Sequence, residues 1–308
     1  MNKPEMKAVV VGGAGFIGSN LTEELLKRGY SVHVVDDFAG GKKENLNEKA
    51  VLHNGSIADL SLLKEAFKDA TYVFHLAALP RVQYSIEHPK ETNEVNVEGT
   101  LNVLIAAHES GVKKVVYSAS SSAYGDQSKM PLVESMPASP KSPYGLQKYV
   151  GELYCKLWSE IYGLPTVCLR YFNVYGPRLD PNGAYALVIG KFLKQRQEGK
   201  PITITGDGEQ TRDFTNVRDV ARANILAAES ANVGKGEVMN IGAGRNFTIN
   251  KLAELIGGPV EHVAPRLEPH DTLADNSLAK KLIGWEPEIQ LEEGIAELKK
   301  EFGITDKN

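Results

Sequence analysis

A tyrosine and a lysine spaced four residues apart, Tyr144 and Lys148, form the pair of side chains in this sequence best suited to acid–base chemistry. Residues at this spacing share one face of a helix. A free tyrosine has a pKa of about 10, too high for a base at neutral pH, but a neighbouring ammonium group favours the phenolate. Tyr144 could then take a proton from a substrate hydroxyl. Because the spacing also arises by chance on amphipathic helices, the pair needs support from the rest of the chain.

A run of hydroxyl side chains upstream of the pair supplies that support. The apolar segment Val115–Tyr117 predicts a strand, and Ser118, Ser120 and Ser122 follow it directly. Ligands of α/β proteins bind at the carboxyl ends of parallel strands, so these hydroxyls are expected at a ligand site. Ser120 is predicted to bridge the reacting hydroxyl and Tyr144, and Ser122 to contact the substrate.

Three glycines, Gly12, Gly15 and Gly18, predict a dinucleotide site between the first strand and the first helix. They allow a tight turn and close backbone approach, while the helix N-terminus presents N–H groups to a pyrophosphate. Asp36, about 20 residues further on, would accept hydrogen bonds from ribose hydroxyls. Its carboxylate repels a 2′-phosphate, so NAD is favoured over NADP. The small residues of segment 75–78 would let the sheet edge approach the same cofactor.

Hydrophobic patterning places these motifs on alternating strands and helices. The expected strands are 7–11, 31–35, 50–53, 72–76, 113–117 and 166–171, and the expected helices are 19–27, 60–67, 91–109 and 144–162. This alternation predicts an α/β fold, a Rossmann-type doubly wound parallel sheet covered on both faces. After about residue 175 the pattern loosens. We therefore expect an NAD-binding domain over residues 1–175 and a smaller α/β lobe, mainly for the substrate, over 176–308, with the chain crossing between them.

The bulk composition narrows the classes of function. The 308 residues carry a net charge of −4, so nothing suggests a basic field for nucleic acid or for an anionic membrane. The two cysteines lack metal-ligand spacing and are too few for a disulfide framework, and no metal is predicted. The sequence shows neither an apolar signal segment nor an apolar run long enough to span a membrane. We expect a cytoplasmic protein.

Together the motifs resemble the extended short-chain dehydrogenase/reductase family over nearly the whole chain. Segments 170–176, 206–214 and 273–275 resemble the nucleotide-sugar 4-epimerases of that family. The resemblance implies a catalytic set of Ser120, Tyr144 and Lys148. It implies a cofactor site of Gly12, Gly15, Phe16, Ile17, Asp36, Ser56, Ile57, Leu76, Ala77, Ala78, Asn96, Ser118, Tyr144, Lys148 and Tyr171. It implies a substrate site of Ser120, Ser122, Tyr144, Asn173, Arg212, Arg266, Glu268 and Thr272.

The same resemblance implies a role for each substrate residue and a reaction. Asn173 and Arg212 would hold the nucleoside diphosphate, Arg266 would reach the diphosphate and Glu268 the ribose. Guanidinium groups suit phosphate oxygens because they donate paired hydrogen bonds. In the implied UDP-hexose 4-epimerase reaction, a hydride passes from sugar C4 to NAD⁺ while Tyr144 takes the hydroxyl proton, and the hydride returns to the other face of the 4-keto sugar. NAD is regenerated in each cycle and is expected to stay tightly bound.

Two departures from the resemblance bear on cofactor and reaction. Relatives usually carry an acidic residue at the position of Ser56, so the adenine contact is expected to change while NAD binding is kept. Where the 4,6-dehydratase branch carries a Thr-Asp-Glu triplet, this chain has Ser120-Ser121-Ser122. The serine triplet lacks the carboxylic acid that eliminates water, so dehydration is disfavoured.

The sequence leaves the preferred sugar open. Thr272 matches the position that borders the sugar C2 substituent, where a small residue would admit UDP-N-acetylglucosamine as well as UDP-glucose. Arg81 lies near the sugar end of the site and could pair with a uronate carboxylate, cap the following helix, or pair with Glu87 or Glu91. The alternatives are therefore a UDP-glucuronate 4-epimerase, a nucleotide-sugar oxidoreductase that exchanges its cofactor, and a non-enzymatic NAD sensor. The intact catalytic set argues against the sensor.

The two long predicted helices, 91–109 and 144–162, carry apolar residues beyond one stripe. The family resemblance implies that they pair across a four-helix interface in a homodimer. The alternative is that both helices only cover the sheet.

Overall fold

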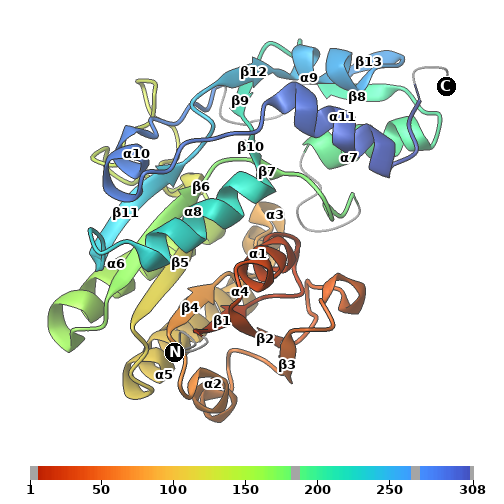
Figure 1. The fold of residues 1–308 in the computed structure, drawn as a ribbon. Coiled ribbons are helices and arrows are strands. Elements are labelled where there is room, and N and C mark those ends of the chain that lie inside the picture. Colours follow the sequence, from red (N-terminus) through yellow and green to blue (C-terminus); the bar gives the residue numbers. More distant parts are fainter. Residues whose placement is uncertain (1–5, 182–187, 265–270, 306–308) are drawn as a thin grey trace.

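The computed structural model describes residues 6–181, 188–264 and 271–305. Its centre is a seven-stranded parallel sheet with the order β11-β6-β5-β4-β1-β2-β3 (Figure 1). The strands are β1 (Lys7–Val11), β2 (Ser31–Asp36), β3 (Val51–Asn54), β4 (Tyr72–His75), β5 (Lys114–Ser120), β6 (Thr166–Tyr171) and β11 (Lys235–Ile241). The strand order reverses between β1 and β4, which is where ligands of such sheets bind. The predicted doubly wound fold is confirmed.

Helices cover both faces of this sheet. They are α1 (Phe16–Lys27) and α8 (Val217–Glu229) on one face, and α2 (Leu60–Phe67), α5 (Gly99–Glu109) and α6 (Pro143–Tyr162) on the other. Side chains alternate along β1, so Ala8 and Val10 join the core beneath α1 and α8, whereas Val9 and Val11 join the core beneath α2, α5 and α6. The sheet is therefore packed between two apolar cores, which fix the strand ends that carry the site.

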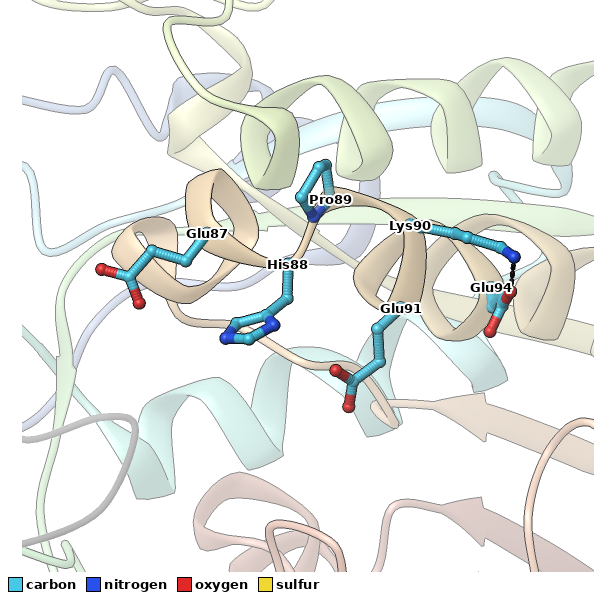
Figure 2. A pocket seen from close by; sticks show the side chains of 6 residues that line it. All are labelled: Glu87, His88, Pro89, Lys90, Glu91 and Glu94. Carbon is cyan, nitrogen blue, oxygen red and sulfur yellow. Dashed lines mark ion pairs between the residues drawn. The ribbon is translucent and has the colours of Figure 1, made fainter.

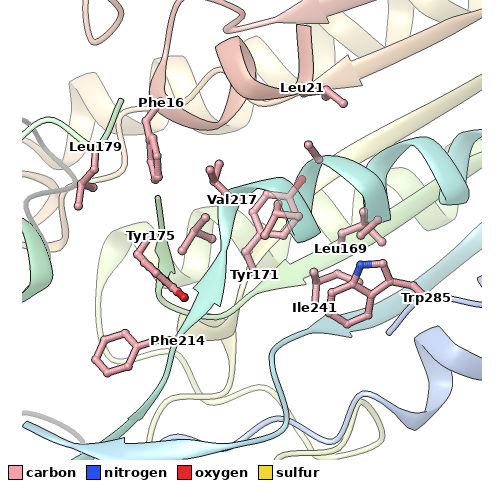
Figure 3. Close-up of a cluster of buried hydrophobic side chains, with 14 of the residues drawn as sticks. Phe16, Leu21, Leu169, Tyr171, Tyr175, Leu179, Phe214, Val217, Ile241 and Trp285 are labelled. Atoms are coloured by element: carbon pink, nitrogen blue, oxygen red, sulfur yellow. The ribbon is translucent and has the colours of Figure 1, made fainter. Parts of the chain in front are cut away.

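The first of these cores continues into the C-terminal part of the chain. Figure 3 shows Leu169 and Ile241 of the sheet in one cluster with Phe214 and Trp285. The Trp285 ring nitrogen also donates to the Asp219 carbonyl oxygen at 2.8 Å. The small lobe is thus packed continuously onto the sheet that it faces.

The helical region before β5 is interrupted. It consists of α3 (Val82–Glu87), α4 (Pro89–Asn93), a π-helical segment (Glu94–Glu98) and then α5. The expected helix 91–109 therefore begins earlier, at Pro89, and contains a π turn. The turn is not predicted from the sequence, because π-helical segments are rare and short.

The described part of the small lobe contains short helices and three two-stranded sheets. Its helices are α7 (Val188–Gln197), α9 (Ile249–Ile256), α10 (Ser277–Ile283) and α11 (Leu291–Glu301). Its strand pairs are β7 (Val174–Tyr175) with β10 (Thr215–Asn216), β8 (Ile202–Thr205) with β13 (Val260–Val263), and β9 (Thr211–Asp213) with β12 (Asn246–Thr248). Because α8 and β11 lie between these elements in sequence, the chain crosses between lobe and sheet more than once.

Neither cysteine is in a disulfide: Cys155 on α6 and Cys168 on β6 are buried free thiols. In the described ranges, no helix is long and apolar enough to cross a membrane. The same ranges contain no group of three or more His, Cys, Asp or Glu residues that could hold a metal ion.

Candidate active site

A cleft of about 880 Å³ opens at the carboxyl ends of β1, β2, β4, β5 and β6. Its wall includes most of the residues that the sequence predicts for cofactor and chemistry. These are Gly12, Gly15, Phe16, Ile17, Asp36, Ile57, Leu76, Ala77, Ala78, Ser118, Ser120, Ser122, Tyr144, Lys148, Tyr171 and Asn173. The cleft thus coincides with the reversal of strand order, as expected for this architecture.

Tyr144 and Lys148 lie in the first turns of α6, facing the end of β5. The helix begins at Pro143 because the Ser142 side chain caps it, accepting a hydrogen bond from Gly145 N at 3.1 Å. Lys148 Nζ donates to the Ser118 carbonyl oxygen at 2.8 Å. It also lies 5.0 Å from the centre of the Tyr117 ring. The ammonium group is thereby held on the side of the helix that Tyr144 occupies.

The surroundings of the pair shift both pKa values. Burial raises the pKa of Tyr144 to about 12, and a hydrogen bond with Ser120 acts in the opposite direction. Burial lowers the pKa of Lys148 to about 8, against the attraction of Cys155 and Glu152. The phenolate of Tyr144 is thus costly at neutral pH unless the lysine charge and a second cation stabilise it.

Ser120 lies at the last position of β5, a strand that ends three residues later than expected. A 3-10 turn, Ser121–Ala123, follows it, and Ser120 Oγ accepts a hydrogen bond from Ser122 N at 3.2 Å. The Ser120 and Ser122 hydroxyl oxygens are 3.1 Å apart. The turn therefore presents both hydroxyls to the cleft beside Tyr144.

The glycine turn fits a dinucleotide pyrophosphate. Gly12 has a φ of +85°, and a Cβ there would lie 2.6 Å from Ala77 N. A Cβ on Gly18 would lie 2.1 Å from the Gly12 carbonyl oxygen. Among the described residues, no side chain caps the first turn of α1. The N–H groups of this turn, at the cleft, are therefore available to an anion.

Asp36 joins this turn to the end of β2. Its Oδ2 accepts a hydrogen bond from Ala14 N and its Oδ1 from Phe38 N, both at 2.8 Å. Burial raises the pKa of this carboxyl group, while the two backbone donors act in the opposite direction. Each oxygen keeps a further lone pair, so the carboxylate can still accept ribose hydroxyls.

The segment after β4 forms the opposite wall. Leu76 N and Ala77 N both donate to the Val11 carbonyl oxygen, at 2.8 and 2.9 Å, which draws this small-residue segment against β1. His75 lies behind it, where its Nε2 is 2.9 Å from Thr100 Oγ1. Burial lowers the pKa of His75 to about 3, so the imidazole is neutral.

Of the described residues predicted to bind the cofactor, Ser56 and Asn96 do not line the cleft. Ser56 Oγ accepts from Ala58 N at 3.3 Å. Asn96 is buried behind the wall, where its Nδ2 donates to Leu79 O and to Gln147 Oε1 at 3.0 and 2.8 Å. Both amide protons of Asn96 are therefore used within the protein.

Two of the predicted substrate residues, Asn173 and Thr272, meet beside Asp213. Asn173 Nδ2 donates to the Asp213 carbonyl oxygen at 2.9 Å and lies 3.3 Å from Thr272 Oγ1. Arg212 is next in sequence to Asp213, and its Nη1 donates to the Thr211 carbonyl oxygen at 2.9 Å. Arg212 and Thr272 do not line the cleft among the described residues. Arg266 and Glu268 lie outside the described residues.

Asp213 is a structural anchor that the sequence reasoning missed. Its fully buried carboxylate accepts hydrogen bonds from Ala243 N, Gly244 N and Ala274 N at 2.7, 3.0 and 3.0 Å. Burial raises the pKa of this group to about 6. The carboxylate thus fixes the segment that carries Thr272, and only its position next to Arg212 gave a signal in the sequence.

Arg81 is exposed and lines the cleft at the start of α3. Its side chain does not cap α3, and it forms no ion pair within the part of the chain that the structure describes. The two carboxylates considered as partners are used elsewhere: Glu87 accepts from Gln83 Nε2 at 2.7 Å and Glu91 from the Tyr84 hydroxyl at 2.6 Å. The guanidinium group is available to a ligand.

A smaller hollow of about 380 Å³ lies where α3 meets α4. It is lined by Glu87, His88, Pro89, Lys90, Glu91 and Glu94 (Figure 2). Figure 2 shows Glu87 and Glu94 at opposite ends of this hollow, with Lys90 Nζ 3.9 Å from Glu94. These groups do not converge on a point, so the chemistry is assigned to the larger cleft.

Comparison with known proteins agrees with this geometry. The model of the NAD dependent epimerase/dehydratase family matches residues 8–242. The crystal structure of a UDP-glucose 4-epimerase from Thermotoga maritima with UDP-glucose is 41% identical, with a TM-score of 0.90 over 97% of this chain and 98% of that one. A UDP-N-acetylglucosamine 4-epimerase from Methanobrevibacter ruminantium, in complex with UDP-N-acetylmuramic acid, is 40% identical, with a TM-score of 0.92 over 97% and 99%. A UDP-glucuronate 4-epimerase from Thermodesulfobacterium geofontis is 38% identical over 308 residues, which cover 93% of each chain.

Proposed function

The chain belongs to the NAD dependent epimerase/dehydratase family, with NAD as its cofactor, and on this premise we propose that it is a UDP-hexose 4-epimerase. The proposed reaction interconverts UDP-glucose and UDP-galactose and extends to the corresponding N-acetyl sugars. The observation that carries the proposal is the convergence of Ser120, Tyr144 and Lys148 on the cleft that the glycine turn closes. The segment 118–125 contains no carboxyl group, which disfavours elimination of water.

The residues present fit the cofactor. The uncapped first turn of α1 would hold the pyrophosphate, Asp36 the adenosine ribose, and Lys148 the nicotinamide ribose. Bound NAD⁺ would accept the hydride from sugar C4 and return it. The positive ring would also serve as the second cation that the Tyr144 phenolate needs.

The side chains of the protein move the proton. The phenolate oxygen of Tyr144 accepts the proton of the sugar 4-hydroxyl, which Ser120 orients, and gives it back when the 4-keto sugar is reduced. Lys148 keeps its charge throughout and stabilises the phenolate at the start of each cycle. The cycle consumes no net proton, so one Tyr–Lys pair suffices for both directions.

The geometry beside Asn173 supports an open sugar C2 pocket. Thr272 does not line the described cleft, but its hydroxyl oxygen accepts from Asn173 Nδ2, which does, at 3.3 Å. At the position that the resemblance assigns to the sugar C2 substituent, a threonine is smaller than a tyrosine, and its size supports use of UDP-N-acetylglucosamine.

One observation favours a second candidate, a UDP-glucuronate 4-epimerase. Arg81 is a cation at the cleft wall without an ion-pair partner in the described ranges. A carboxylate at sugar C6 would supply that partner, because guanidinium groups bind carboxylates through two parallel hydrogen bonds.

We also propose that the protein is a homodimer. Exposed apolar side chains lie along α6 at helical spacing, where Leu146, Leu153, Leu157 and Ile161 are 51%, 45%, 43% and 67% exposed. Contiguous apolar stripes of this kind on a protein surface mark interfaces. Pairing of α5 and α6 with their copies would bury this stripe.

The experiment is to incubate the purified protein, without added cofactor, with UDP-glucose, UDP-N-acetylglucosamine or UDP-glucuronate and to separate the C4 epimers by chromatography. Conversion of the first two substrates is the expected result. Conversion of UDP-glucose alone would mean that Thr272 does not leave the C2 pocket open. Conversion of UDP-glucuronate alone would replace the first candidate by the second.

A further inference from the structure

Gln147 lies inside the Tyr-x-x-x-Lys motif, yet it does not line the described cleft. It is 4% exposed and faces the contact between α6 and the π-helical segment. Its Oε1 accepts a hydrogen bond from Asn96 Nδ2 at 2.8 Å, and its Nε2 donates to Thr92 Oγ1 at 3.0 Å. A buried amide bonded at both ends is held in one orientation, because losing either bond leaves a polar group desolvated.

Asn96 extends this connection to the wall of the cleft. Its Oδ1 accepts from Leu79 N at 2.7 Å, and its Nδ2 donates to Leu79 O at 3.0 Å. Leu79 lies beyond the end of β4, so these two bonds take the place of strand pairing. The residues on either side, Ala78 and Pro80, line the cleft with Leu79 itself.

Asn96 is itself fixed through its backbone. It lies in the middle of the π-helical segment, a feature that often occurs at functional sites. Thr100 Oγ1 donates its one proton to the Asn96 carbonyl oxygen at 2.8 Å. The buried His75 must therefore donate to Thr100 through Nε2–H. The connected side chains run from behind β4 to α6 without reaching solvent.

We propose that Gln147 is a positioning residue for the epimerase reaction. Gln147 connects the wall segment 77–81, through hydrogen bonds with Asn96, to the helix that carries Tyr144 and Lys148. The cofactor and the sugar would be held between this wall and that helix, so this hydrogen-bonded tie sets the spacing of the reacting atoms. A misplacement of about 1 Å can reduce a rate by about 100-fold. The inference rests on the proposed function.

The test compares Gln147→Ala and Gln147→Glu with wild type. In Gln147→Ala, kcat per NAD-loaded site is expected to fall about 10- to 100-fold while KM stays within about threefold of wild type, because the proposed function assigns the nucleotide half of the substrate to Asn173 and Arg212 and not to this wall. The introduced carboxyl group of Gln147→Glu can replace both amide bonds only when protonated. Its activity relative to wild type is therefore expected to be highest at low pH and to fall as the pH rises.

A second measurement tests the hydrogen-bonded tie between the wall and α6 independently of enzymatic activity. Hydrogen exchange at the Leu79 amide is expected to accelerate in Gln147→Ala, because Asn96 loses one of its supports. Thr22→Val is the matched control: the buried Thr22 hydroxyl on α1 has no hydrogen-bond partner among the described residues, so neither kcat nor Leu79 exchange should change.

The outcomes distinguish a failure of the positioning role of Gln147 from a failure of the proposed function. Unchanged kcat and unchanged exchange in Gln147→Ala would overturn the positioning role. A loss of thermal stability or NAD loading with unchanged kcat per loaded site and an unchanged pH profile would also overturn it, in favour of a structural role. If wild type converts none of the UDP-sugars, the proposed function fails, and the exchange rate at Leu79 still decides whether the tie exists.

Discussion

Replacing Lys148 by methionine removes the ammonium group next to Tyr144 while keeping an unbranched side chain. With a pKa of about 12 for Tyr144, forming the phenolate at pH 7.5 requires about 6 kcal/mol, at about 1.36 kcal/mol for each pKa unit. Side chains four residues apart on a helix lie roughly 5–6 Å from each other, and a unit charge at that distance contributes on the order of 3 kcal/mol at an effective dielectric constant of about 20. The remainder would come from the positive ring of NAD⁺. Lys148→Met should therefore lower kcat by about 100-fold at pH 7.5.

The pH profile makes this prediction specific to the charge. Without the ammonium group, Tyr144 must ionise at a pKa above the assay range, so kcat of the variant is expected to rise about tenfold per pH unit between about pH 7 and pH 10. Wild type should rise less steeply and level off. The assay is conversion of UDP-galactose to UDP-glucose at saturating substrate, normalised to bound NAD.

Stability provides the control for this variant. The pKa of Lys148 is lowered from 10.5 to about 8 in the folded chain, so the unfolded chain binds its proton more tightly. The cost of burying the charged lysine is fully present below about pH 8 and disappears above about pH 10.5. Lys148→Met should thus be at least as stable as wild type at pH 7. A variant that is stable, retains NAD and keeps kcat within about threefold of wild type with a parallel pH profile would refute the assigned role.

Three further predictions test other parts of the structure. Glu152→Gln removes the charged partner of Arg170 from a buried, bidentate pair (2.7 and 2.8 Å) and should lower the free energy of unfolding in urea by about 3–5 kcal/mol. The control, Glu198→Gln, changes an exposed pair and should alter the free energy of unfolding little. Equal effects of the two variants would contradict the argument from burial. Arg81→Ala should leave kcat/KM for UDP-glucose nearly unchanged and abolish any turnover of UDP-glucuronate, and a loss with UDP-glucose instead would place Arg81 at the diphosphate. Leu157→Glu should convert the dimer to a monomer in light scattering, while Val260→Glu, an equally exposed site on β13, should not; a monomeric wild type would exclude the proposed α5–α6 interface.

The first half of the fold could be predicted from the sequence because each signal there is local. The strand Lys7–Val11 and the helix Leu60–Phe67 have the predicted bounds, since continuous apolar runs and helical spacing mark them directly. The same holds for the cleft, because the glycine turn and the serine triplet follow strand ends, which meet at one edge of a parallel sheet, and the Tyr–Lys pair is marked by its own helical spacing.

The remaining features depend on contacts between distant segments. The π turn around Asn96 is stabilised by side-chain bonds to Leu79 and Gln147, and neither partner is marked by its sequence neighbours. Asp213 accepts backbone N–H groups from positions 30, 31 and 61 residues away, so its role emerges only when the lobe is folded. Strand β11 joins the large sheet from within the loosely patterned half of the chain, where spacing alone does not say which sheet it extends.

The most direct test of the central claim uses UDP-glucose deuterated at C4, incubated with the purified protein without added NAD. Transient oxidation at C4 with return of the same hydride predicts UDP-galactose that retains the deuterium at C4, with no transfer to water. Loss of the label to solvent, or a requirement for added NAD in stoichiometric amounts, would contradict the account.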